Sequence, residues 1–367
     1  MPDRGAAPGT LLHREPFERD VPFGVRGTRI LHATTITGGV AETASAIVLV
    51  PPAAAGRRGV VVWMHGTTGV ASGCAPSLLE RPFAHTPALE EALAHGWIVV
   101  APDYAGLGTR GTHGYLVGED EGRAAIDSLR AARSLPEVGP VGPIVVWGHS
   151  QGGHAALWAA TLAPSYAPEL ALSGVAVAAP ASMPGPLMRA AQDSPVGRIM
   201  TSYVIRAYAA RYPDVDPAAL VRPAARLLVA DMARRCLAGK PALVSVLEAW
   251  LLDAPVLTGD PTQGALGARL DENVPRGPIG VPVLIAQGTL DDLVLPGVQD
   301  GYVAGRCAAG QAIDYRRYAG DDHLSLVSDA SRFPAELVAW THERIQGTAA
   351  PAGCTVATRA VPPRRVR

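Results

Sequence analysis

The segment from residue 143 to residue 162 constrains the fold of this chain more than any other part of its sequence. An apolar run, PIVVW, leads into GHSQGG at residues 148–153, and an alanine-rich stretch follows. The pattern G-x-S-x-G between a buried strand and a helix is typical of a sharp turn that holds the serine at its corner. Small residues are needed two positions to either side of that serine, because the chain passes close to itself there. We therefore predict a strand, a tight turn at Ser150 and a helix over residues 151–162.

Short apolar runs alternate with helical segments along most of the chain. Most of these runs are rich in Val and Ile, as expected of strands that are buried on both faces of a parallel sheet. The alternation predicts an α/β fold. The predicted strands are Ala46–Val50, Val60–Met64, Trp97–Ala101, Pro143–Trp147, Gly174–Ala178, Pro282–Gln287 and Ile313–Tyr318, and the predicted helices are Pro87–His95, Glu119–Ser134, Gln151–Leu162 and Ser331–Ile345.

Between residues 183 and 275 the strand signal fades, and apolar residues recur at three- and four-residue steps. This periodicity predicts helices, inserted as a cap between two strands of the sheet. The predicted organisation is therefore a core made of residues 1–182 and 276–349, a cap of residues 183–275, and a proline- and arginine-rich surface tail over residues 350–367.

A serine hydroxyl needs a base, and the base must follow the serine on a loop at the carboxyl ends of the strands. His323 lies in GDDHLS, directly after the predicted strand 313–318, whereas the alternative, His342, lies within a predicted helix. The acid is expected after the preceding strand, in GTLDDLV. There we favour Asp291, which comes first after the turn, over its neighbour Asp292. The order Ser, Asp, His predicts an α/β-hydrolase fold with a mostly parallel central sheet, flanking helices and a helical cap insertion.

An oxyanion hole requires two backbone N–H groups that point to the place where negative charge develops. The first is expected from Gln151, the residue after the nucleophile. The second is expected from the loop HGTTG at residues 65–69, which follows the predicted strand 60–64. We favour the amide of Thr68, with that of Thr67 as the alternative, and we interpret His65 as a structural histidine.

The composition excludes several classes of protein. The formal net charge of −1 gives no electrostatic reason to expect nucleic acid, and the single lysine, Lys240, has no context for lysine-based catalysis. No metal motif is present and the chemistry needs no cofactor. No apolar stretch reaches the roughly 18 residues that span a bilayer, so we expect no integral membrane association. The first residues do not show the layout of a secretory signal. This predicts a cytoplasmic protein, the alternative being a secreted one whose sequence begins after a removed signal.

Four stretches of the sequence resemble the secretory lipase family of α/β hydrolases, which includes the Candida lipase A type. They are HGTTGVASGCAPS at 65–77, PDYAGLG at 102–108, GHSQGGHAALW at 148–158, and GTLDDLV at 288–294 together with His323. The resemblance covers nearly the whole chain. It implies Ser150, Asp291 and His323 as catalytic triad, the amides of Thr68 and Gln151 as oxyanion hole, and an acyl-binding site beneath the cap.

The four cysteines permit two disulfides in three connectivities, and free buried thiols are the alternative. The resemblance to the secretory lipases implies the pairs Cys74–Cys236 and Cys307–Cys354.

Three functions fit these patterns. The first is hydrolysis of a carboxylic ester or lipid through an acyl-enzyme on Ser150, by a serine esterase or lipase. The second passes the same acyl group to another acceptor, as in an acyltransferase or a thioesterase/cyclase with a biosynthetic substrate. The third is ligand binding on a hydrolase scaffold that has lost catalysis. The apparently complete triad favours the first two.

Overall fold

The computed structural model describes residues 5–52 and 57–361. In these residues one sheet of ten strands runs through the molecule, with the strand order β1-β2-β3-β5-β4-β6-β7-β8-β9-β10. The strands are β1 (Leu11–Pro16), β2 (Arg26–Ile36), β3 (Val40–Val50), β4 (Arg58–Met64), β5 (Ile98–Pro102), β6 (Val141–His149), β7 (Leu172–Ala178), β8 (Val283–Gly288), β9 (Ile313–Tyr318) and β10 (Cys354–Arg359). From β5 to β10 every pairing is parallel, while β1, β2 and β3 pair antiparallel. The predicted α/β-hydrolase fold is confirmed.

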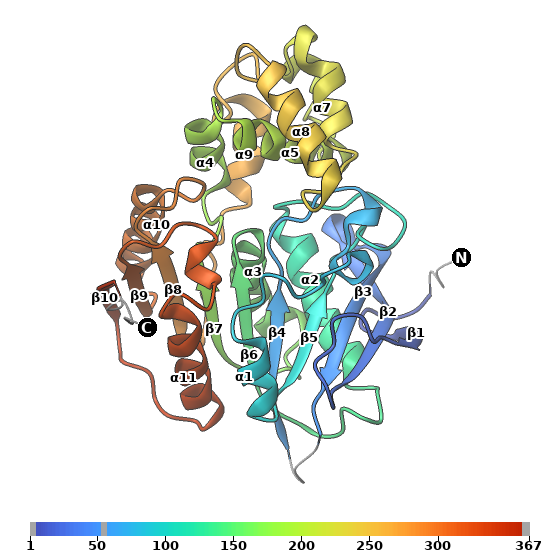
Figure 1. The fold of residues 1–367 in the computed structure, drawn as a ribbon, viewed down its shortest axis with the longest axis vertical. Helices are drawn as coiled ribbons and strands as arrows, with labels where there is room; N and C mark the ends of the chain where they lie inside the picture. Colours follow the sequence, from blue (N-terminus) through green and yellow to red (C-terminus); the bar gives the residue numbers. More distant parts are fainter. Residues whose placement is uncertain (1–4, 53–56, 362–367) are drawn as a thin grey trace, which may run out of the picture.

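The parallel strands are apolar on both faces because helices cover both faces. In β4, Val61 and Trp63 belong to one buried cluster, and Val60, Val62 and Met64 belong to the other. Helices α1 (Leu89–Ala94) and α11 (Phe333–Ile345) pack on the first face, and α2 (Gly118–Ala132), α3 (Gln151–Tyr166) and α10 (Pro296–Ala308) pack on the second (Figure 1). The strands therefore read as continuous hydrophobic runs, as the sequence indicated.

The chain between β7 and β8 forms the predicted helical cap. Its helices are α4 (Pro184–Ala191), α5 (Pro195–Arg211), α6 (Pro217–Leu220), α7 (Arg226–Met232), α8 (Lys240–Leu251) and α9 (Gly264–Glu272). In Figure 1 the cap stands at the top, beyond one end of the strands. Among the described residues, no helix is both long and apolar enough to cross a bilayer.

The C-terminal segment corrects one expectation. Residues 354–359, placed in a surface tail, form β10, which pairs parallel with β9 at the edge of the sheet. The side chains of β10 are mostly exposed, so it has no apolar signal. A disulfide between Cys354 and Cys307, at the end of α10, ties it to the core. The rest of the expected tail, from residue 362, lies outside the described residues.

Candidate active site

Ser150 lies at the corner between β6 and α3, with φ 56° and ψ −120°. Its backbone N–H donates a hydrogen bond to the carbonyl oxygen of Ala178, at the end of β7, over 3.0 Å. Two glycines make this corner possible. A Cβ on Gly148 would lie 2.1 Å from the carbonyl oxygen of Gly152, and a Cβ on Gly152 would lie 1.9 Å from that of Met64. The structure thus has the strained turn that exposes a nucleophilic serine in hydrolases.

Asp291 and His323 meet on the loops that follow β8 and β9. The Nδ1 atom of His323 lies 2.8 Å from Oδ2 of Asp291, and both residues are buried. The other carboxylate oxygen, Oδ1, accepts the backbone N–H groups of Leu293 and Val294 over 2.9 and 2.8 Å. Backbone N–H groups therefore hold the carboxylate in place, and its second oxygen accepts the hydrogen on Nδ1 of His323. Nε2 of His323 is then left without a hydrogen and can accept a proton.

The structure brings His323 against the residue that precedes Ser150. The rings of His149 and His323 have centroids 4.6 Å apart, and Nε2 of His149 lies 3.0 Å from the carbonyl oxygen of His323. Burial holds the pKa of His149 well below its usual range, so His149 is neutral and donates from Nε2. Among the hydrogen bonds of the described residues, none joins the Ser150 hydroxyl to His323 directly. Such bonds often tighten only when substrate binds.

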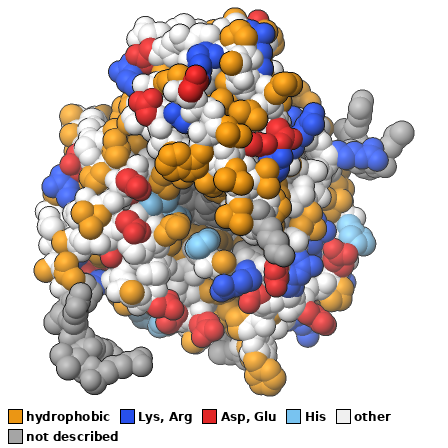
Figure 2. Space-filling model, turned by 45° about the horizontal axis from the view of Figure 1, so that its top comes forward, with side chains coloured by type: hydrophobic (Ala, Val, Ile, Leu, Met, Phe, Trp, Pro, Cys, Tyr) orange, Lys and Arg blue, Asp and Glu red, His pale blue; other side chains and the backbone are white. Residues whose placement is uncertain are grey.

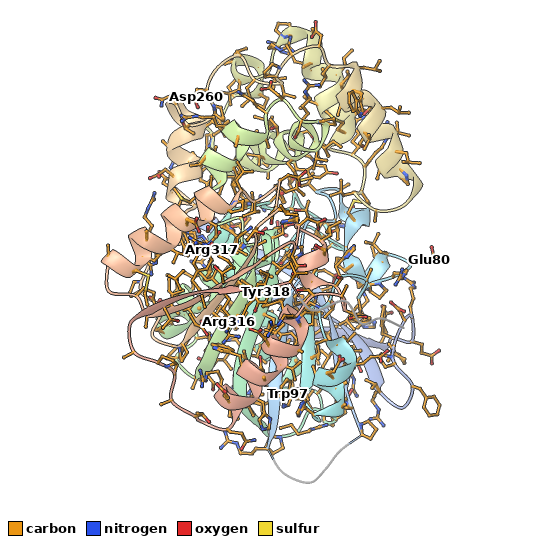
Figure 3. The ribbon with its side chains drawn as sticks, turned by 60° about the vertical axis from the view of Figure 1, so that its left-hand side comes forward. Glu80, Trp97, Asp260, Arg316, Arg317 and Tyr318 are labelled. Atoms are coloured by element: carbon orange, nitrogen blue, oxygen red, sulfur yellow. A yellow bond between two sulfur atoms is a disulfide. The ribbon has the colours of Figure 1, made fainter. Side chains whose placement is uncertain are left out.

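The alternative candidates for the acid and the base are exposed, bonded within their own loop or distant from Ser150. Asp292 is exposed, and the flanking Asp322 accepts hydrogen bonds within its own loop, from the N–H groups of Leu324 and Ser325. His342, on α11, stacks on Trp97, just before β5 begins. In Figure 3 Trp97 lies near the bottom of the molecule, far from the cap residue Asp260 at the top. His342 is therefore at the amino ends of the strands, and Ser150 is at the carboxyl ends.

The loop after β4 lies beside the serine corner. A Cβ on Gly66 would be 3.4 Å from Nδ1 of His149 and 3.7 Å from Cβ of Ser150. Further along the loop, the hydroxyl of Thr68 is buried without a hydrogen-bond partner among the described residues. The hydroxyl of Thr67 lies 3.0 Å from that of Tyr115. Gln151 is the first residue of α3, where backbone N–H groups are not used within the helix.

Two links tie this loop to the cap, and no pattern in the sequence indicates the second. Cys74 and Cys236 form a disulfide with an S–S distance of 2.15 Å, the pair that the family resemblance implied. Next to it, the backbone N–H of Leu237 donates to the carbonyl oxygen of Thr68 over 2.8 Å. The cap is thereby fixed at one point to the loop that carries an expected oxyanion donor.

The surface is hollowed between the cap and the sheet domain. Figure 2 shows this hollow with hydrophobic side chains around it and histidine side chains at its border. A second cavity, of about 600 Å³, lies at the amino ends of β8 and β9 and is lined by Val283, Ile313 and Trp340, among others. Because catalytic groups of this fold lie at the carboxyl ends of the strands, the hollow under the cap is the candidate substrate site.

The serine corner, the Asp–His pair and the mostly parallel sheet define an α/β hydrolase of the lipase or esterase kind. The chain belongs to the secretory lipase family, whose model matches residues 84–353, and this confirms the resemblance seen in the motifs. It is 27% identical over 353 residues to a probable inactive lipase of Mycobacterium tuberculosis, covering 88% of this chain and 75% of that protein. It is 26% identical over 383 residues to lipase A of Arthroderma benhamiae, covering 96% and 79%.

Solved structures show the same fold. Candida antarctica lipase A in its closed state superposes with a TM-score of 0.79 at 20% identity, over 96% of this chain and 86% of that one. The ligand-bound rice cell wall degrading esterase LipA from Xanthomonas oryzae superposes with a TM-score of 0.71 at 20% identity, over 94% and 100%. At these identities the structures establish the fold alone.

Proposed function

We propose that this protein hydrolyses carboxylic esters through an acyl-enzyme on Ser150. Nε2 of His323 takes the proton of the serine hydroxyl as Oγ attacks the ester carbonyl carbon. Asp291 holds the imidazole in the required tautomer and stabilises its positive charge. The amides of Gln151 and Thr68 stabilise the oxyanion of the tetrahedral intermediate. His323 then returns the proton to the leaving alcohol, and water, activated by the same histidine, releases the acid.

The observation that carries this proposal is the 2.8 Å hydrogen bond between Asp291 and His323, in a loop held against the residue before Ser150. This contact supports the assignment of Asp291 as the acid and His323 as the base. The hydrophobic border of the hollow supports a substrate with an apolar acyl chain (Figure 2). One relative is named as inactive, so catalysis itself is the first property to measure.

A panel of p-nitrophenyl esters of increasing acyl length, given to wild type and to Ser150→Ala, tests this proposal. We expect hydrolysis by wild type and its loss in the variant, together with covalent labelling of Ser150 by a fluorophosphonate probe. Product analysis with and without an added alcohol separates hydrolysis from acyl transfer to that alcohol. Equal rates for wild type and Ser150→Ala would contradict the proposal, and binding of an ester without turnover would indicate a ligand-binding protein.

We also infer that the protein works in an oxidising compartment. Two disulfides form within the described residues. Cys74 and Cys236 are 162 positions apart in the sequence, and Cys307 and Cys354 are 47 positions apart. Disulfides persist in secreted and periplasmic proteins and are rare in the cytosol. This supports the secreted alternative. Titration of free thiols in protein purified from its native host without reductant tests it, since four reactive thiols under denaturing conditions would contradict it.

A further inference from the structure

A cluster of buried polar side chains lies behind the serine corner, and the mechanism above uses none of them. The cluster consists of Glu121 in the first turn of α2, His113 in the loop before it, and Gln151 and His154 at the start of α3. Each of these residues is at most 1% exposed. Burying polar groups so completely is unfavourable unless each finds a partner. The partners therefore show what the cluster holds in place.

The hydrogen bonds of the cluster fix the orientation of the Gln151 side chain. Nδ1 of His113 lies 3.2 Å from the carbonyl oxygen of Ala105, so this nitrogen carries the hydrogen and Nε2 is an acceptor. The Nε2 amide of Gln151 lies 2.9 Å from Nε2 of His113 and 2.6 Å from Oε1 of Glu121. Both amide hydrogens are thus used. The opposite orientation would turn the amide oxygen toward the carboxylate of Glu121.

Glu121 is itself held from several sides. Its Oε1 accepts the backbone N–H of Leu116 over 3.2 Å, and its Oε2 lies 3.4 Å from Nδ1 of His154. The other ring nitrogen of His154 lies 2.7 Å from the carbonyl oxygen of Asn273. Burial raises the pKa of Glu121, and the hydrogen bonds from His154 and Gln151 oppose this shift. The carboxyl group is therefore a fixed anchor, which donors from α3 and from the loop before α2 reach.

The same loop also supports the other side of the expected oxyanion hole. The hydroxyl of Tyr104, in the PDYAGLG motif, donates to the carbonyl oxygen of His65 over 3.0 Å. The ring of Tyr104 lies between those of His65 and His113, at centroid distances of 4.4 and 5.7 Å. His65 begins the loop that contains Thr68. The segment from residue 103 to residue 121 thus contacts both parts of the chain that carry the expected oxyanion amides.

We propose that Glu121 is a positioning residue for ester hydrolysis, which holds the backbone N–H of Gln151 in the oxyanion hole through the Gln151 side chain. This inference rests on the proposed function. An oxyanion donor acts only when it already points to the place where charge develops, and loss of one donor lowers kcat by about 10²- to 10³-fold. A backbone N–H that is present but free to change its orientation stabilises the oxyanion less. Because the oxyanion forms only in the transition state, the loss falls on kcat and leaves KM almost unchanged.

The test compares Glu121→Met, Glu121→Gln and Gln151→Met with wild type on the best p-nitrophenyl ester. Glu121→Met and Gln151→Met each break the side-chain link but keep every backbone N–H. We expect kcat to fall by about 10-fold or more, with KM within about 2-fold of wild type. The inhibition constant of a trifluoromethyl ketone, which forms an oxyanion with Ser150, should rise by the same factor as kcat falls. Glu121→Gln keeps an acceptor oxygen for Gln151 and should recover most of kcat.

Asp127→Asn is the matched control. Asp127 is a buried carboxyl group on the same helix, but its partners are Thr34, Tyr166 and Arg130, away from α3's first turn. This variant should lower the melting temperature and leave kcat and the inhibition constant unchanged. If Glu121→Met does not fold, Gln151→Met tests the same link.

The outcomes distinguish the two proposals. Wild-type kcat and inhibition constant in a folded Glu121→Met or Gln151→Met would overturn the positioning role. A decrease of the same size in Asp127→Asn would overturn it too, by showing a general effect of destabilisation. Activity that survives in Ser150→Ala would instead overturn the proposed function.

Discussion

The backbone N–H of Leu237, in the cap, donates a hydrogen bond to the carbonyl oxygen of Thr68, in the loop after β4. The adjacent disulfide, Cys74–Cys236, reinforces this contact. Gly69 shows how closely the two segments pack, since a Cβ there would lie 2.8 Å from Sγ of Cys74 and 3.0 Å from Cα of Cys236. The cap and the loop after β4 are therefore held together at this point.

Removing the Cys74–Cys236 disulfide should affect both stability and catalysis. We expect Cys74→Ala/Cys236→Ala to lower the free energy of unfolding by about 2–5 kcal/mol, because the unfolded chain gains freedom. It should also lower kcat, because the Thr68 loop loses its tie to the cap. Urea unfolding and ester hydrolysis measure the two effects. Cys307→Ala/Cys354→Ala is the control, since that disulfide anchors an edge strand away from the site, and it should lower stability only. Equal kcat in the two double variants would contradict the prediction.

Asp291→Asn should lower kcat by about 10³- to 10⁴-fold, because the amide can no longer hold His323 in the tautomer that leaves Nε2 free. Stability should change little by comparison, and a urea unfolding curve checks that the variant is folded. The neighbouring Asp292 is exposed and offers a matched substitution. Asp292→Asn should hydrolyse the same ester at the wild-type rate. The reverse pattern would assign the acid to Asp292.

Gly152→Ala should destabilise the protein by at least about 3 kcal/mol, since the added methyl group would meet the carbonyl oxygen of Met64 in a tightly packed turn. The midpoint of urea unfolding measures this change. Gly301→Ala, in the exposed part of α10, is the control because nothing lies within 4 Å of an added Cβ. There alanine should raise stability by about 0.5–1 kcal/mol, as expected inside a helix. A mild effect of Gly152→Ala would contradict the tight turn.

His32 should make the protein less stable as the pH falls from 6.5 toward 4. Burial lowers its pKa to about 4, so in that range the unfolded chain binds a proton that the folded protein does not. The free energy of unfolding then rises with pH by about 1.4 kcal/mol per unit for this residue. Between pH 7 and pH 5, His32→Asn should therefore lose about 2 kcal/mol less stability than wild type. Urea unfolding at both pH values measures the difference.

His13 provides the control for this experiment, because it lies exposed on the edge strand β1. His13→Asn, the same substitution at an exposed position, should leave the stability near that of wild type. Parallel losses of stability in wild type and His32→Asn would show that His32 is not the group responsible.

The sequence predicted the parts of this fold whose signal is local. The buried strands β4 to β8 appear as apolar runs, and the turn at Ser150 appears as glycines at fixed positions. β1 and β10 were missed because their side chains are mostly exposed. β2 was missed because its buried positions alternate with partly exposed ones, several of which carry polar side chains. The two edge strands, β1 and β10, are defined by the strands they pair with.

The supporting contacts of the site could not be predicted in the same way. Glu121 lies in an acidic first turn, which suggested only a favourable charge for the helix dipole. Its contacts with Gln151 and His113 join residues 30 positions apart or less, but they form only after α2 and α3 pack together. Likewise, no pattern in the sequence marks the bond between Leu237 and Thr68. The order of motifs predicts which groups react, whereas the contacts that support them follow from tertiary packing.

The cap leaves the sheet after β7 and returns at β8, and these two strands are direct neighbours joined by parallel pairing. An insertion between adjacent strands can be exchanged as a module without altering the register of either strand. Chimaeras that carry a relative's insertion, and that keep the Cys74–Cys236 disulfide and the Leu237–Thr68 hydrogen bond, would show whether the cap sets the substrate range. Exchange of this insertion during evolution could likewise change the acyl selectivity while the chemistry is conserved.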